Sequence, residues 1–88
     1  MAIIPTTLTA TELANHLAEQ VIPLRAMFRS TNAQTGIGAV YVHDGVFALV
    51  RALRAGEMAP AVARVRLLGI NRQGACYGIR HITAHPAP

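Results

Sequence analysis

The chain has 88 residues, 52% of them hydrophobic, and a formal net charge of +4 with histidine neutral. This length allows one domain, and this apolar fraction excludes a chain that is disordered by composition. The four acidic residues leave almost no material for paired-carboxylate catalysis.

The compartment is predicted from what the sequence lacks. The longest apolar runs, IGAVYV and VFALV, fall far below the roughly 20 residues that a transmembrane helix needs. The start MAIIP has neither the basic region nor the long apolar region of a signal peptide. Cys76 is the only cysteine, so no internal disulfide forms, in agreement with a reducing compartment. We expect a cytoplasmic protein without membrane contact.

The first elements are a short edge strand over 1–6 and a helix that begins at Thr9. Thr9 and Glu12 have the spacing of a capping box. Pro23 removes one helical hydrogen bond, so the helix either kinks or restarts there. A kink is favoured because the apolar stripe stays in phase across Pro23, through Leu13, Leu17, Val21, Leu24 and Phe28. The polar run STNAQTG then ends the element.

The middle of the chain predicts a strand followed by a second helix. Residues 37–43 are apolar on both alternating faces, which is typical of a central strand. Asp44 followed by glycine would suit a tight hairpin. Helical spacing of the following apolar residues favours instead a helix with Asp44 as N-cap and Gly56 just past its C-terminus.

The C-terminal third predicts a β-hairpin. After a connector over 57–61, residues 62–70 and 75–83 form two strands around the turn NRQG. The expected fold is therefore α+β, a two-layer α/β sandwich of order (β)αβαββ with two helices on one face of a small sheet. It would form one domain over 1–83, with a flexible tail over 84–88.

The hairpin register predicts a cluster of arginines, since Arg66 falls opposite Arg80 and Arg64 lies on the same face. Like charges directly opposite are destabilising. Either the arginine stems shield apolar residues of an exposed sheet face, or the guanidinium groups bind an anion such as phosphate or an acidic protein partner. Three further arginines are candidates for the same contact: Arg72, Arg51 and Arg54.

The other motifs give weaker predictions of a functional site. His81 and His85 have no cysteine or carboxylate near them in sequence, so we expect no metal site and no cofactor. His43 and Asp44 resemble a base and its orienting carboxylate, but neighbouring strand residues point to opposite faces. Cys76 is expected to be structural rather than reactive.

The function expected from these features is that of a small non-enzymatic binding module. The arginine face would contact nucleic acid or another polyanion. The alternative is a protein-interaction or inhibitor module of the kind found in phage or plasmid accessory proteins, which would use the same arginine and leucine residues. A short chain with so much apolar surface also predicts a homo-oligomer.

Overall fold

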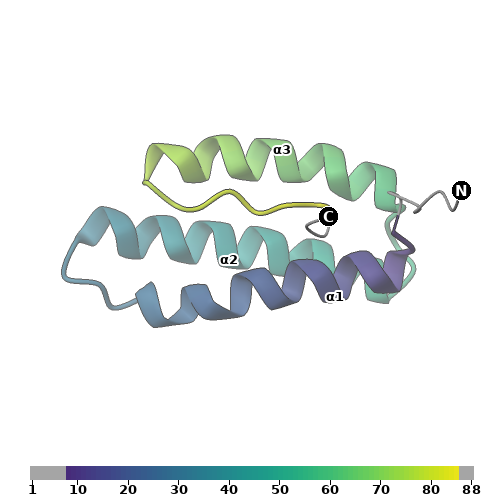
Figure 1. The fold of residues 1–88 in the computed structure, drawn as a ribbon, viewed down its shortest axis with the longest axis horizontal. Helices are drawn as coiled ribbons and strands as arrows, with labels where there is room; N and C mark the ends of the chain where they lie inside the picture. Colours follow the sequence, from purple (N-terminus) through teal and green to yellow (C-terminus); the bar gives the residue numbers. More distant parts are fainter. Residues whose placement is uncertain (1–7, 86–88) are drawn as a thin grey trace, which may run out of the picture.

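The computed structural model describes residues 8–85 and is entirely helical, with no strand in that range. The elements are α1 (Ala10–Val21), the 3₁₀ helix η1 (Ile22–Met27), α2 (Ala33–Arg54) and α3 (Pro60–Cys76). The three α-helices run in alternating directions, and an extended segment after α3 turns back between α3 and α2 (Figure 1). The predicted two-layer α/β sandwich is therefore wrong.

The first helix has the expected start. The side chain of Thr9 accepts a hydrogen bond from the Glu12 N–H, and Glu12 accepts one from the Thr9 N–H, so the predicted capping box is present. At Pro23 the α-helix has ended and the chain continues as η1, with the proline in the first turn, where its missing N–H leaves no bond unmade. The strand expected over 1–6 lies outside the described residues.

The predicted strand 37–43 is wrong, because it forms the first half of α2. This helix begins eleven residues before Asp44, at the N-cap Asn32, whose side chain accepts hydrogen bonds from the N–H groups of Gln34 and Thr35. Its end agrees with the sequence prediction, since Gly56 follows the C-cap Ala55 with φ +72°.

The predicted hairpin is also wrong, because 62–70 and the NRQG turn both lie inside α3. Pro60 occupies its first turn. The helix ends in a Schellman motif: the Gly78 N–H donates to the Ala75 carbonyl, and the Ile79 N–H donates to the Gly74 carbonyl. Gly78, with φ +73°, reverses the chain, so residues 79–85 return along α3 as an extended segment rather than as a strand of a sheet (Figure 1).

The core forms around α2, which contacts α1, η1 and α3. Leu17 and Leu53 are buried, as their helical spacing predicts, but they pack among helices rather than on a sheet. Ile79 and Ile82 of the extended segment complete the core. Buried residues occur along the whole of α2: Gly36, Gly38, Ala39, Val42, His43, Val46, Leu49, Val50 and Leu53.

Within residues 8–85, α2 is the one helix with the length and composition of a membrane span, with a mean hydropathy of 1.3 over its most apolar stretch. Buried core helices have the same length and composition, and half of this stretch is buried inside the fold.

Candidate functional site

The arginines predicted to share one sheet face are dispersed over the helices. Arg64 and Arg66 both lie on α3, but residues two apart on a helix point to nearly opposite sides. Arg64 is half-buried and Arg66 is exposed. Arg80 lies in the extended segment after α3 and is exposed, so the predicted pairing of Arg66 with Arg80 across a hairpin is absent.

The other candidate arginines are also exposed. Arg72 lies on α3, two turns after Arg64. Arg51 and Arg54 occupy the last turn of α2, where cations are favourable because the helix dipole is negative there. Arg54 donates a hydrogen bond to the Asn15 side chain, at 3.3 Å.

The outward side of α3 carries an apolar stripe. Val62, Val65 and Leu68 are spaced by three residues and are 45%, 68% and 62% exposed. Arg66 lies one turn after Val62, and Arg72 lies one turn after Leu68. We call these five residues the α3 outer face. A surface helix ordinarily has polar residues on its outward side, whereas α3 has apolar residues on both its inward and its outward side.

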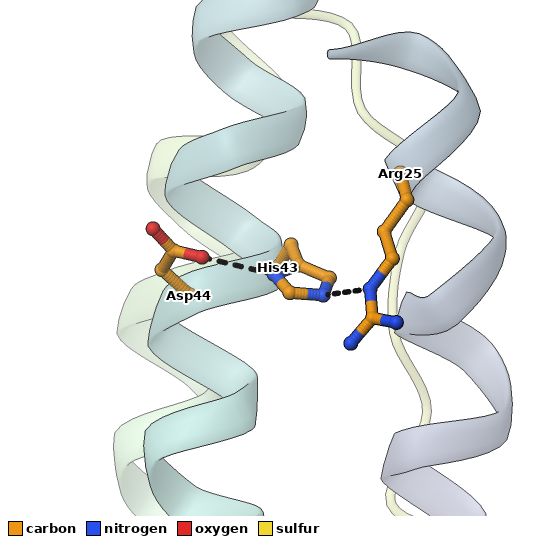
Figure 2. Close-up of polar contacts among 3 residues, drawn as sticks. All are labelled: Arg25, His43 and Asp44. Carbon is orange, nitrogen blue, oxygen red and sulfur yellow. Dashed lines mark hydrogen bonds and ion pairs between the residues drawn. The ribbon is translucent and has the colours of Figure 1, made fainter.

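A second cluster surrounds the buried His43 (Figure 2); the sequence analysis considered His43 and Asp44 as a pair but set the pair aside, and it did not include Arg25. The Arg25 Nε–H of η1 donates to His43 Nε2 at 3.0 Å. An arginine nitrogen only donates, so Nε2 accepts and the imidazole proton lies on Nδ1, which donates to Asp44 Oδ1 at 2.9 Å. The sequence interpretation separated His43 from Asp44 because it placed them on a strand, whereas in α2 their side chains meet.

Aromatic rings complete this cluster. The Phe28 ring meets His43 edge-on, with centroids 5.1 Å apart, and the Phe47 ring stacks on it at 5.6 Å. The guanidinium carbons of Arg25 and Arg51 lie 5.7 and 5.8 Å from the Phe47 centroid, within the range of a cation–π interaction. Both ring nitrogens of His43 are occupied, so the imidazole has no free lone pair with which to act as a base.

Residues 79–85 lie in a groove formed by α1, α2 and α3. Asn71 of α3 exchanges two hydrogen bonds with the main chain of Ile82, and Gln20 of α1 exchanges two with the main chain of Thr83. A hollow of about 700 Å³ remains between the segment and the α1–η1 side. Its walls include His16 and Glu19 as well as residues of the segment.

The described part of the chain has one exposed thiol and no cluster of metal-ligating side chains. No group of three or more histidine, cysteine or acidic residues within 8–85 is placed to hold a metal ion. Cys76 is exposed at the end of α3, with its Sγ 3.7 Å from the Arg72 carbonyl oxygen.

Comparisons of this chain with protein-family models, with curated proteins and with solved structures find no match.

Proposed function

We propose that the protein is a non-enzymatic binding module whose α3 outer face docks on an apolar, acidic-edged surface of a partner protein. The observation that carries this proposal is the exposure of Val62, Val65 and Leu68 along one side of α3. Exposed apolar residues scattered singly are ordinary, but a contiguous group edged by polar residues is typical of an interaction surface.

The energy available from this face suits a docking contact. Burying the exposed parts of the three side chains would contribute on the order of 3–5 kcal/mol before the loss of translational freedom is subtracted. That is enough to anchor a small interface when charge pairs at its edge add to it.

The charges on the face favour an acidic partner. Arg66 and Arg72 are exposed, and α3 has no acidic residue anywhere along its length. Two copies that met through this face would bring arginines against arginines, which disfavours self-association there. A partner with glutamate or aspartate beside its apolar residues would instead gain attraction and a faster association rate.

A second candidate function is contact with nucleic acid through the arginines. Within residues 8–85, no arginine forms a salt bridge with a carboxylate, since the one close contact of a basic group with a carboxylate is the hydrogen bond from the neutral His43 to Asp44. The proposed contacts are those arginines that face the same nucleic-acid strand, and they would come from Arg64, Arg66, Arg80, Arg72, Arg51 and Arg54. Their dispersion over several surfaces favours the protein partner over this alternative.

The test is an NMR titration of the labelled protein with a synthetic amphipathic helix that has leucines on one face and glutamates beside them. We expect amide shifts along the α3 outer face. Leu68→Ser should weaken binding about tenfold, equal to about 1.4 kcal/mol, without lowering the melting temperature. Ile37→Ser is the matched control, because Ile37 is 58% exposed on α2, away from this face.

A peptide that fails to bind, or that binds wild type and Leu68→Ser equally, contradicts the protein-docking proposal. Duplex DNA, titrated at two salt concentrations, tests the second candidate. Binding with a log–log salt slope of about −0.9 per phosphate contact, reduced by about one contact in Arg66→Ala, would favour nucleic acid instead.

A further inference from the structure

The extended segment after α3 is held in the way that a protein holds a peptide. Ile79 and Ile82 are 6% and 2% exposed, while Arg80, His81 and Thr83 are exposed. The two isoleucines therefore act as apolar anchors, and the intervening residues face solvent. The segment is therefore held like a bound extended peptide, and its two anchors belong to the core.

Two side-chain amides recognise the main chain of the segment. Asn71 Nδ2–H donates to the Ile82 carbonyl at 2.8 Å, and the Ile82 N–H donates to Asn71 Oδ1 at 2.9 Å. Gln20 makes the same pair with Thr83, with both distances 2.8 Å. Each amide replaces the donor and acceptor that a neighbouring β-strand would supply.

The wall of the groove formed by α2 matches the start of the segment. A Cβ atom on Gly38 would lie 2.3 Å from Tyr77 Cβ and 2.9 Å from Ile79 Cγ1. The close approach of Tyr77 and Ile79 to α2 therefore depends on a position without a side chain.

One turn connects the segment to α3. Gly78 has φ +73°, and the Schellman motif around it contributes two hydrogen bonds, from the N–H groups of Gly78 and Ile79. Glycine also adopts the extended conformation readily, so this turn can straighten without steric strain. Opening it breaks those two bonds and leaves the rest of α3 intact.

We propose that the groove of one copy takes the segment from residue 79 onward of a second copy, so that two copies form a dimer by reciprocal exchange. The contacts made by an exchanged segment are the same as those made within one chain. The equilibrium between monomer and exchanged dimer then depends on the conformation of the Gly78 turn and on protein concentration. This interface adjoins the α3 outer face, because Val65 and Leu68 line a hollow together with Ile82, but it does not depend on the proposed partner there.

The test uses the full chain with His16→Cys, Thr83→Cys and Cys76→Ser. His16 Nε2 lies 3.0 Å from Thr83 Oγ1, and the main-chain bonds of residue 83 to Gln20 do not involve the substituted side chains. A flexible bis-maleimide cross-linker does not require the two Cα atoms to lie within the roughly 7 Å that a disulfide needs. It joins residues 16 and 83 within one chain if the segment stays in its own groove, and joins two chains if the segment is exchanged. Denaturing gel electrophoresis separates the two products.

We expect an interchain product whose share rises up to about tenfold for a tenfold rise in concentration while the dimer is the minor species. The matched control carries Asn15→Cys, Arg54→Cys and Cys76→Ser, because these side chains meet between α1 and α2 and stay within one chain during exchange. An intrachain product alone at every concentration would overturn the proposal. So would an interchain share equal to that of the control.

A second measurement needs no substitution. Isotope-labelled and unlabelled wild-type protein are unfolded together, refolded at high concentration and examined for nuclear Overhauser effects between copies. Contacts from Ile82 of one copy to Leu67 or Asn71 of the other support exchange. Contacts found only within single copies overturn it, and contacts between copies confined to the α3 outer face indicate a different dimer.

Discussion

The side-chain amide of Asn71 and the main chain of Ile82 form a closed pair of hydrogen bonds, 2.8 and 2.9 Å long, eleven residues apart in sequence. Ile82 is 2% exposed, so its main-chain groups depend on this amide. The pair therefore joins the extended segment to α3 at Ile82, which is more buried than the segment's other anchor, Ile79.

Removing that amide should destabilise the fold. Asn71→Ala leaves the N–H and the carbonyl of Ile82 without partners, which costs about 1–3 kcal/mol. Urea unfolding followed by circular dichroism measures the loss. Asn15→Ala is the matched control, because Asn15 is exposed and its partner Arg54 can bond to water instead, so a change below about 0.5 kcal/mol is expected. Equal losses in the two variants would mean that the segment contributes little stability.

Two glycine substitutions should have opposite effects. Gly38→Ala would place a Cβ 2.3 Å from Tyr77 Cβ, so the end of α3 must shift, and the free energy of unfolding should fall by about 1–3 kcal/mol. Gly69→Ala meets no atom within 4 Å and lies inside α3, where alanine favours the helix by about 0.5–1 kcal/mol. Melting temperatures that move in the same direction would show that the contact of α2 with Tyr77 is not tight.

The capping box should make stability depend on pH. The hydrogen bond from the Thr9 main chain, followed by that with its side chain, lowers the pKa of Glu12 from the usual 4.5. Because the pKa is lower in the folded protein, the contribution is complete above pH 4.5 and is lost as the pH falls through the lowered value. The melting temperature of wild type should therefore exceed that of Glu12→Gln by more at neutral pH than in strong acid. A difference that does not change with pH would contradict this.

Arg64 should be replaceable without loss. Its Nε and Nη2 atoms are buried and have no hydrogen-bond partner among residues 8–85. Arg64→Met keeps the apolar stem and removes the buried polar atoms, so stability should stay unchanged or rise by about 1–2 kcal/mol. Arg66→Met, at an exposed position, should change it by less than about 0.5 kcal/mol. A marked loss at position 64 alone would mean that the guanidinium group has a partner in solution.

Local interactions explain why α1 could be predicted. Thr9 and Glu12 are three residues apart, and Leu13, Leu17 and Val21 follow at helical spacing, so the cap and the apolar stripe lie within one stretch of chain. The glycine stop at Gly56 is similarly local, because it depends on a backbone angle that few other residues adopt.

The error over 37–43 has its cause in the position of α2. A helix that packs against α1, η1 and α3 is apolar on several sides, and over seven residues such a run cannot be distinguished from a central strand. The helical conformation of α3 was not predicted from its inward-facing residues for a different reason. The inward-facing side consists partly of small residues, Ala63 and Gly74, which carry little apolar signal, while Val65, Arg66 and their neighbours alternate as in a strand.

The same distinction between local and long-range interactions applies to the candidate surfaces. Sequence alone determined that the protein is basic, that its cations are all arginine, and where α1 begins and α2 ends. Only the tertiary structure decided which arginines share a surface, that His43 joins Arg25 to Asp44, and that Ile79 and Ile82 lie in a groove. The physical reason is that caps and turns depend on neighbours within about four residues. Burial depends on packing among residues that lie far apart in the sequence. It also depends on which face of a helix a residue occupies, and neighbouring residues lie on different faces.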